Sequence, residues 1–396
     1  MTRPIRILSV FQEIGWGGDE SRLLAMAIRI DRTRFEHSVL SLLENTSDRE
    51  HAGFSERVRQ YEDMGVVVRS LSQEKPAAER SPNSGPLQRK VAILHQAMRL
   101  ARLVKRWKID VLDVRTAAYF VGALAGRISS TPTVVTLYHG IRDGDRVTWP
   151  WPLRTALMLT DCVLTDSEVR AAEFRSHVGR RKDKVVVIPN GIPQPHSELG
   201  ICQARELFGL PCEESSPVIG QVGRLIEFKG QTILLRAAPS ILARYPKARF
   251  LIVGFTEDAA YRERLQQLAD VLGIADHVRI ISYPGPIGDV WRAIDIHVHP
   301  SIFDSLPVSI AEGMSWSKPA VVTSAGGIPE LVEHGKTGLV VPPGDPTALA
   351  SAILRLLDDP ALARQLGQAA RRRYEQRYRP EIMTQALEEL FLQMAN

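Results

Sequence analysis

The chain has 396 residues, of which 44% are hydrophobic and 24% are charged, a composition typical of a soluble two-domain enzyme. The net charge of +5 suits anionic small molecules or an anionic membrane surface, and it is too small to indicate nucleic-acid binding. The three cysteines (Cys162, Cys202 and Cys212) are scattered and predict neither a disulfide framework nor a zinc site, which favours a reducing cytoplasm.

Short β-branched runs alternate with amphipathic stretches along the whole chain, which is the pattern of parallel sheets covered by helices. Two doubly wound α/β domains are therefore predicted. Strands of the first are expected at 6–10, 37–43, 66–71, 110–114, 133–138, 162–165 and 184–188, and strands of the second at 217–223, 249–253, 277–281, 294–299, 319–323 and 338–341.

Two irregular stretches interrupt these patterns. The segment from Ile188 to Gly200 holds three prolines and two glycines, so we expect a hinge there, with domains at 1–192 and 193–377 and substrate in the cleft between them. The segment from Ser72 to Pro86 has no apolar period and is predicted to be a surface loop. Neither a signal peptide nor an 18-residue apolar run is found, so we expect a soluble or peripheral protein.

Two carboxylates, Asp304 and Glu312, stand on either side of a predicted helix start, with Ser305 as N-cap and Pro307 in the first turn. The unpaired amides of a helix start bind anions. A carboxylate would repel a phosphate in direct contact, so Asp304 is expected to bind an uncharged group that the phosphate carries, such as sugar hydroxyls. Glu312 lies about two turns further on, roughly 10 Å away, where it can accept hydrogen bonds from a ribose diol. Either acid alone would more often be an ordinary capping or exposed residue.

Basic residues and glycines follow two other predicted strands. Arg224 and Lys229 flank a strand-to-helix turn, and a lysine at a helix start is unfavourable unless an anion lies between the lysine and the helix. We therefore expect both residues to bind a diphosphate at the carboxyl edge of the sheet, where open α/β folds bind ligands. Gly326 and Gly327 form a predicted turn that allows close approach of a ligand, although any turn would use glycine in the same way.

Together, these motifs resemble the retaining GT-B glycosyltransferases of family 4. The ordered set is VGRLIEFKG, DSLPVSIAEGM, GGIPELV and GLVVPPGD in the second half, with GWGGDE, TVVTLYHG, VLTDSE and VIPNGIP in the first. The resemblance extends from Arg6 to about Pro360. It implies two Rossmann-like domains facing a central cleft, and it suggests that the C-terminal helix, 378–396, packs back on the first domain.

The resemblance also implies residue roles in the second half. Arg224 and Lys229 match the basic pair on the donor diphosphate, and Glu312 matches the acid on the ribose hydroxyls. Asp304 matches the acid that contacts the transferred sugar, where the family usually has glutamate. Pro307 replaces a usual glycine and has no amide, which leaves as expected phosphate or sugar donors the amides of Ser305, Leu306 and Val308.

In the first half, Gly17 and Gly18 match the glycine pair whose loop meets the donor phosphates and the acceptor, and His139 matches the histidine that points at the donor sugar. By themselves these residues would be read as a strand-to-helix turn and a structural histidine. The catalytic set implied is His139, Asp304, Arg224 and Lys229.

The resemblance implies transfer of a hexose-type sugar from a nucleoside-diphosphate sugar with retention of configuration and without a metal cofactor. The basic pair would stabilise the leaving diphosphate, whose own oxygen takes the acceptor proton in a same-face, substrate-assisted step. The expected acceptor is a hydroxyl of a glycan, a lipid-linked sugar or a small molecule. The donor base is expected to contact backbone near Ser282 to Gly285.

Other interpretations of the sequence remain open. Asp143 and Asp145 form a DxD pair, a metal motif of the other glycosyltransferase fold, but arginines flank it. His297 and His299 share one strand face, with no third zinc ligand evident. A nucleotide-sugar epimerase of the same two-domain shape is the alternative function. An NAD-dependent oxidoreductase would need a dinucleotide fingerprint, and a non-catalytic nucleotide-binding protein would have lost a diphosphate-binding residue.

The segment from Gln88 to Leu112 is a basic amphipathic helix followed by the start of a strand. One reading is contact with anionic lipid at the inner face of the cytoplasmic membrane, with Trp149 and Trp151 as interfacial anchors. The other is a solvated basic face in a cytoplasmic protein, with the tryptophans packed in the protein.

Overall fold

The computed structural model describes residues 3–12, 14, 18–42, 52–71, 86–137, 141–143, 146–179, 181–256 and 258–396. The chain forms two compact units, and each is described by itself. The first unit comprises Met1–Gly191 and Pro380–Asn396, and the second comprises Ile192–Arg379. The change of unit after Gly191 falls inside the proline- and glycine-rich segment.

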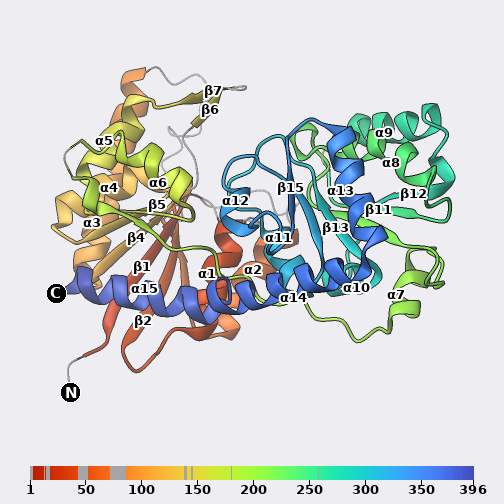
Figure 1. Cartoon of the computed structure of the whole chain (residues 1–396). Helices are drawn as coiled ribbons and strands as arrows, with labels where there is room; N and C mark the ends of the chain where they lie inside the picture. Colours follow the sequence, from red (N-terminus) through yellow and green to blue (C-terminus); the bar gives the residue numbers. More distant parts are fainter. Residues whose placement is uncertain are drawn as a thin grey trace. The chain divides into compact units, whose positions relative to one another are not determined.

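The first unit contains a parallel sheet of seven strands in the order β3-β2-β1-β4-β5-β8-β9 (Figure 1). Each strand overlaps one predicted strand, which confirms the expected α/β class. The strands are β1 (Ile5–Phe11), β2 (Phe35–Ser41), β3 (Val67–Ser70), β4 (Val111–Arg115), β5 (Thr133–Thr136), β8 (Cys162–Thr165) and β9 (Val185–Val187).

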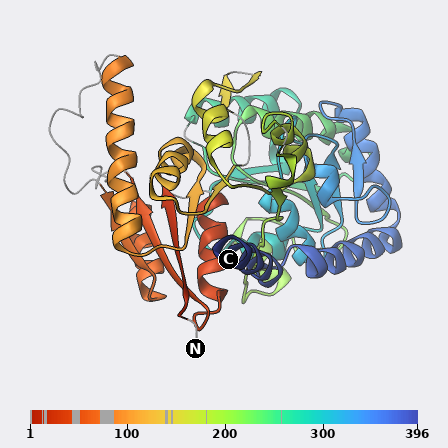
Figure 2. The ribbon, with the colours of Figure 1, turned by 90° about the vertical axis from the view of Figure 1, so that its left-hand side faces the viewer.

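Helices cover both faces of this sheet. One core forms between the sheet and the helices α3 to α6, and Figure 2 shows α3 as a long helix beside the strands. The other core forms between the sheet, α1 and the C-terminal helix α15. The helices are α1 (Gly18–Arg29), α2 (Ala52–Asp63), α3 (Pro86–Arg106), α4 (Tyr119–Ser129), α5 (Trp151–Leu159), α6 (Glu168–Arg175) and α15 (Pro380–Ala395).

The helix α15 supplies part of the first unit's core from the far end of the chain. Met383, Leu387 and Phe391 are buried against Ile7 of β1 and Met26 of α1. An ion pair between Arg29 and Glu381 (2.8 Å) adds a contact at the surface. The last sixteen helical residues therefore belong to the same hydrophobic core as the first strand.

The second unit contains a parallel sheet of six strands in the order β12-β11-β10-β13-β14-β15. These strands also overlap the predicted ones. They are β10 (Val218–Val222), β11 (Arg249–Val253), β12 (Val278–Ile281), β13 (Ile296–His299), β14 (Ala320–Thr323) and β15 (Leu339–Val341). The covering helices are α7 (Ile201–Leu207), α8 (Gln231–Leu242), α9 (Ala259–Val271), α10 (Ile287–Ala293), α11 (Val308–Ser315), α12 (Ile328–Leu331), α13 (Pro346–Asp358) and α14 (Pro360–Arg377).

Two local features differ from the sequence-based expectations. A small antiparallel pair, β6 (Ile141–Asp143) and β7 (Arg146–Thr148), follows the fifth strand of the first sheet, and strands of three residues are too short to show an alternating pattern. Cys202 and Cys212 form a disulfide with their Cα atoms 5.0 Å apart, which corrects the prediction that no disulfide forms. Cys202 lies in the short helix α7 and Cys212 follows it, and their separation of ten residues gave no recognisable signal.

The predicted surface loop at 72–86 lies outside the described residues except for Pro86, which begins α3. Among the helices that the structure describes, none combines the length and the apolar character needed to cross a bilayer.

Candidate functional site

The site is built on the two central strands of the second sheet, β10 and β13, which lie side by side although they are far apart in sequence. The chain leaves both strands at their carboxyl ends, the edge where open α/β sheets bind ligands. The two following loops touch, because the amide of Ile302 donates to the carbonyl oxygen of Phe228 (2.8 Å). Gly230 has a φ of 71°, and a Cβ there would lie 2.1 Å from the carbonyl oxygen of Pro300, so this close approach requires glycine.

Asp304 is the centre of the polar contacts in these loops. Its Oδ2 lies 2.5 Å from Lys229 Nζ and 2.9 Å from His299 Nε2, and it accepts a hydrogen bond from Ser301 Oγ (3.3 Å). Its Oδ1 accepts a hydrogen bond from the amide of Ser305 (3.2 Å). The structure thus brings together Lys229 and Asp304, which the sequence predicted to act on the diphosphate and the sugar.

The charge state of this cluster follows from its surroundings. Burial opposes ionisation of Asp304, but the hydrogen bond from His299 and the charge of Lys229 outweigh it and hold the pKa of the carboxyl well below its usual range. Burial lowers the pKa of His299, and this effect exceeds the opposing effect of Asp304. At neutral pH the cluster is therefore an Asp–Lys ion pair beside a neutral imidazole.

His299 is oriented from both of its ring nitrogens. Nε2 faces the Asp304 carboxylate and donates to it, so Nδ1 of the neutral ring is the acceptor for Ser309 Oγ (3.3 Å). Ser301 Oγ also lies 3.0 Å from Nε2. Sequence reasoning treated His299 only as a weak zinc candidate. Its position as the last residue of a strand, five residues before the acid, is the signal that could have identified it.

A third loop supports the backbone of Asp304. Gly326, after β14, has a φ of 56°, and a Cβ at this position would lie 1.8 Å from the carbonyl oxygen of Asp304. The amide of Gly327 donates to the same oxygen (3.2 Å). The predicted glycine turn therefore fixes the position of Asp304, in addition to any contact it makes with a ligand.

The helix after Asp304 begins later than predicted. Pro307 occupies the N-cap position and α11 starts at Val308, so Ser305 is not the N-cap. A proline has no side-chain group with which to cap the helix, and no described group accepts a hydrogen bond from the amides of Leu306 and Val308. These two amides, together with the start of the helix, provide the donor set that an anion requires.

Arg224 lies at the carboxyl end of β10 with an exposed side chain. Its carbonyl oxygen accepts a hydrogen bond from Gln231 Nε2 (2.9 Å), which fixes the backbone, while no described residue pairs with the guanidinium group. The structure therefore does not bring Arg224 into the Asp304 cluster. The guanidinium is exposed and, within the residues that the structure describes, available for a ligand.

Glu312 lies further along α11, away from Asp304 and in a less polar setting. Burial raises the pKa of its carboxyl to about 7, although a hydrogen bond from Trp291 Nε1 (3.3 Å) partly opposes this shift. Glu312 as a whole residue is half-buried. Lys318, six residues further along the chain, donates to the carbonyl oxygen of Ile294 (2.5 Å).

The segment expected to contact the donor base, Ser282 to Gly285, follows β12 at the same edge of the sheet. Ser282 Oγ donates to the carbonyl oxygen of Gly254 (2.9 Å), which joins this segment to the turn after β11. Tyr283 donates to Asp289 (2.6 Å), and this hydrogen bond raises the pKa of the phenol to about 12. The segment is thus anchored by its own side chains.

Of the first-half residues expected at the site, Gly17 and His139 lie outside the described residues, and Gly18 is the first residue of α1. Sequence reasoning missed a buried polar cluster in the first unit. Asp113 of β4 accepts hydrogen bonds from Arg115 Nη2 (2.6 Å) and Ser9 Oγ (2.7 Å), and Arg115 Nη1 also pairs with Asp19 in the first turn of α1 (3.0 Å). This cluster ties the strand to the start of the helix.

No group of three or more His, Cys, Asp or Glu side chains within the described part of the chain is placed to hold a metal ion. His297 is fully buried, and His299 faces Asp304 and two serines. Asp145 of the DxD pair lies outside the described residues.

Each half of the chain matches a protein-family model. Residues 16–194 match the family described as Glycosyltransferase Family 4, and residues 204–373 match Glycosyl transferases group 1. The chain is 32% identical over 209 residues to a D-inositol 3-phosphate glycosyltransferase of Corynebacterium urealyticum, covering 50% of this chain and 49% of the relative. It is 28% identical to a 2-deoxystreptamine glucosyltransferase of Streptomyces kanamyceticus, covering 66% and 71%. The chain thus spans about half the length of the first of these relatives.

Solved structures share the fold over nearly the whole chain. A glycosyltransferase of Rickettsia africae superposes with a TM-score of 0.82 at 19% identity and 99% coverage of both chains. The Anabaena protein HepE, solved in complex with UDP, superposes with a TM-score of 0.77 at 23% identity, covering 98% of this chain and 100% of the other. These similarities establish the two-domain Rossmann-like architecture of GT-B proteins for this chain.

Proposed function

We propose that this chain, which is built from the two domains of a GT-B glycosyltransferase, transfers a hexose-type sugar from a nucleoside-diphosphate sugar to an acceptor hydroxyl. The observation that carries the proposal is the pairing of Asp304 with Lys229 and His299 beside the amides of Leu306 and Val308, which have no hydrogen-bond acceptor among the described residues. A fixed negative charge next to free amide donors fits a ligand that is anionic at one end and hydroxylated at the other.

The donor would be held along the carboxyl edge of the second sheet. The amides that precede and begin α11, together with Arg224 and Lys229, bind the diphosphate. Asp304 accepts hydrogen bonds from the transferred sugar, and Glu312 accepts them from the ribose. The family resemblance supports each role, and HepE, which has the same fold, was solved with UDP and with UDP-glucose.

The reaction breaks the bond between the anomeric carbon and the diphosphate oxygen while the acceptor oxygen bonds to the same face of that carbon. The acceptor proton passes to an oxygen of the departing diphosphate, so no protein carboxylate has to act as base. Arg224 and Lys229 stabilise the charge that develops on the leaving group. The step therefore retains the anomeric configuration and proceeds without a metal cofactor.

The first unit would bind the acceptor, with Gly17, Gly18 and His139 near the reacting atoms. Curated relatives are named for acceptors with several hydroxyl groups, D-inositol 3-phosphate and 2-deoxystreptamine. We therefore include small polyhydroxylated molecules with glycans and lipid-linked sugars as acceptors of this chain.

Contact with anionic lipid at the inner face of the cytoplasmic membrane is part of the same proposal. Along α3, Val91 and Leu94 are exposed, and Arg102 and Lys105 are exposed further along the helix. This combination of exposed apolar and basic residues fits a lipid surface. Trp149 instead stacks on His177 (3.8 Å between ring centroids) and is no free anchor. Co-sedimentation with anionic liposomes at physiological salt tests the contact, and equal pelleting with and without lipid would exclude it.

The transfer itself is tested by incubating the protein with a panel of nucleotide sugars, with and without candidate acceptors, and measuring the free nucleoside diphosphate. We expect the release of nucleoside diphosphate to depend on an acceptor. The product should have the same anomeric configuration as the donor, and the activity should be unchanged in EDTA. The alternative, an epimerase, would convert the donor sugar without an acceptor and without stoichiometric release of nucleotide, and that outcome would overturn the proposal.

A further inference from the structure

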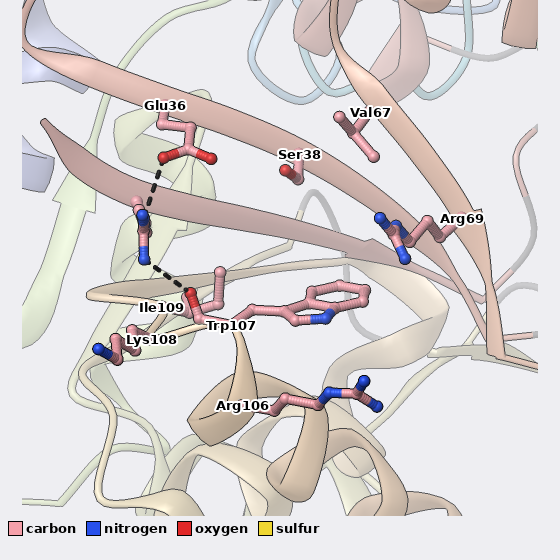
Figure 3. Close-up of a pocket in the computed structure, with 9 residues that line it drawn as sticks. Glu36, Ser38, Val67, Arg69, Arg106, Trp107, Lys108 and Ile109 are labelled. Atoms are coloured by element: carbon pink, nitrogen blue, oxygen red, sulfur yellow. Dashed lines mark hydrogen bonds and ion pairs between the residues drawn. The ribbon is translucent and has the colours of Figure 1, made fainter.

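A pocket of about 350 Å³ lies in the first unit, between the carboxyl end of α3 and the face of the sheet formed by β1, β2 and β3 (Figure 3). The volume falls in the range of small-molecule sites. Most of its polar lining is basic, because it includes Arg6, Arg69, Arg106 and Lys108.

Among the described residues, most of the basic side chains in this pocket have no hydrogen-bond acceptor. Arg6 is paired with Glu36 (2.9 Å) and also donates to the carbonyl oxygen of Trp107 (3.3 Å). In contrast, no described residue accepts a hydrogen bond from Arg69, Arg106 or Lys108. After the one acid is paired, three positive charges remain around the pocket.

Two of these charges flank an aromatic ring. Arg69 packs its guanidinium carbon 4.9 Å from the centroid of the Trp107 ring. In the view of Figure 3, Arg106 lies on the opposite side of that ring from Arg69. A guanidinium that stacks on a ring keeps its N–H groups free in its own plane, and this fork matches a phosphate in two-point contact.

The dipole of α3 does not explain the position of every basic residue around this pocket. The carboxyl end of a helix favours basic residues, which explains Arg106 in the last turn of α3. It does not explain Arg69, which comes from the edge strand β3. Nor does it explain why Lys108, whose φ is 53°, occupies a position after the helix that usually takes glycine. The ammonium group of Lys108 adds to the positive charge around the pocket.

The pocket is separate from the proposed donor site. Arg6 and Glu36 are each the second residue of their strands, so the pocket lies at the amino ends of β1 and β2. Sugar-nucleotide chemistry in this fold is expected at the carboxyl ends, and the donor-site residues belong to the other unit.

We propose that this pocket is a second binding site, which takes a phosphate monoester between Arg69 and Arg106 with its organic group against Trp107. The phosphate replaces solvent as the partner of the guanidinium groups. The partly exposed indole and the exposed Val67 offer apolar contact for a ring or hydrocarbon. The proposal does not depend on the sugar transfer described above.

The test uses the full chain with a saturating nucleoside diphosphate present, so that phosphate binding at the donor site does not contribute. Phenyl phosphate, inorganic phosphate and phenol are titrated by calorimetry. We expect phenyl phosphate to bind more tightly than inorganic phosphate, and phenol not to bind. Hydrogen exchange measured by mass spectrometry should slow in the peptides that contain residues 67–70 and 104–109 when phenyl phosphate is added.

Two matched double variants locate the site. Arg69→Gln with Arg106→Gln should weaken phenyl phosphate binding by about tenfold or more, because charged hydrogen bonds are lost. Arg127→Gln with Arg181→Gln removes the same charge from exposed positions of the first unit that do not line the pocket, and should change affinity by less than about twofold. Equal weakening by both pairs would show diffuse surface attraction and overturn the proposal.

Vesicles distinguish a lipid headgroup from a free phosphate as the source of the monoester. Phosphatidylcholine vesicles are compared with vesicles that contain phosphatidic acid. Binding to phosphatidic acid that is lost in the Arg69 and Arg106 pair but kept in the control pair assigns the pocket to a lipid phosphate. If neither phenyl phosphate nor phosphatidic acid binds at concentrations up to about 10 mM, the proposal is wrong.

Discussion

Both units place an aspartate with a basic partner near the carboxyl edge of their sheet, and the two clusters differ in access to solvent. Asp113 and Arg115 in the first unit have side chains that are both 0% exposed. Asp304 and Lys229 in the second unit have side chains that are each 14% exposed. In the first pair, Asp113 also accepts a hydrogen bond from Ser9 Oγ, and Arg115 also donates to the Asp19 carboxylate. The second pair lies beside a loop in which the amides of Leu306 and Val308 find no acceptor in the described part of the chain.

This contrast separates a structural ion pair from a binding site. A fully enclosed charge pair holds elements together, and the loss of one partner leaves a buried charge without compensation. A pair that keeps some exposure can exchange one of its contacts for a ligand at a smaller cost. We therefore expect changes at Asp113 and Arg115 to act on folding, and changes at Lys229 and Asp304 to act on turnover.

The largest expected effect is on the enclosed pair. Arg115→Met should lower the free energy of unfolding by about 3–5 kcal/mol, because Asp113 would stay buried without its cation. Denaturant titration followed by circular dichroism measures this change. A loss below about 1 kcal/mol would show that the pair is not structural and would remove the contrast between the units.

Lys229→Ala should lower turnover by about a hundred- to a thousandfold, because the leaving diphosphate loses a charge partner. The thermal midpoint should change little, since Asp304 keeps His299 and the Ser305 amide. Lys247→Ala is the control, because Lys247 forms an exposed ion pair with Glu213 in the same unit. Turnover of the Lys229 variant within threefold of the unchanged protein would contradict the proposed function.

Gly326→Ala tests how far the glycine turn positions Asp304. The added Cβ would meet the Asp304 carbonyl oxygen, so we expect a loss of about 1–3 kcal/mol in stability and a fall in turnover. Gly344→Ala is a matched control, because Gly344 also has a positive φ of 78° but no atom within 4 Å of a new Cβ. Steady-state kinetics should separate the two variants, and equal turnover would mean that the contact with Asp304 is unimportant.

The smallest effect concerns Glu312, whose carboxyl has a pKa of about 7. A pKa raised above the unfolded value stabilises the fold fully below about pH 4.5, and this contribution is lost as the pH rises through 7. Ribose hydroxyls bind better to the ionised carboxylate, so nucleotide affinity should rise by about three- to tenfold between pH 6 and 8.

The matched ligand for this prediction is a 2′,3′-dideoxynucleoside diphosphate, which carries the same phosphates without the diol. The affinity of this dideoxynucleotide should not depend on the ionisation of Glu312. In the Glu312→Gln variant, the affinity of the ribonucleotide should show the same, weaker dependence on pH. The measurement is calorimetry at pH 6, 7 and 8. An equal pH dependence for both nucleotides would contradict the ribose role.

The sequence predicted the strands well because buried parallel strands are short β-branched runs between breakers, and these are local signals. It also singled out Asp304 and Lys229, since each follows a strand and strand ends share one edge of the sheet. Their mutual contact and the role of His299 depend on the pairing of β10 with β13, which local sequence does not encode. The later start of α11 reflects Pro307, which takes the N-cap position in place of Ser305.

The clusters of the first unit were harder to foresee. Asp113 and Arg115 lie two residues apart in a strand, where a polar pair is more often a solvated edge than a buried ion pair. The cluster forms only because Asp19 and Ser9 arrive from other elements. The Cys202–Cys212 disulfide was also missed, because a separation of ten residues between two cysteines does not by itself predict a disulfide.

The packing of α15 into the first unit affects how this protein folds during synthesis. Ile7 and Met26 are synthesised before the second unit, but their neighbours Leu387 and Phe391 are synthesised after it. The second unit is contiguous in sequence and can complete its core sooner. The first unit, although translated first, therefore reaches its final packing last, and its exposed apolar surface during that delay is where chaperone binding would concentrate.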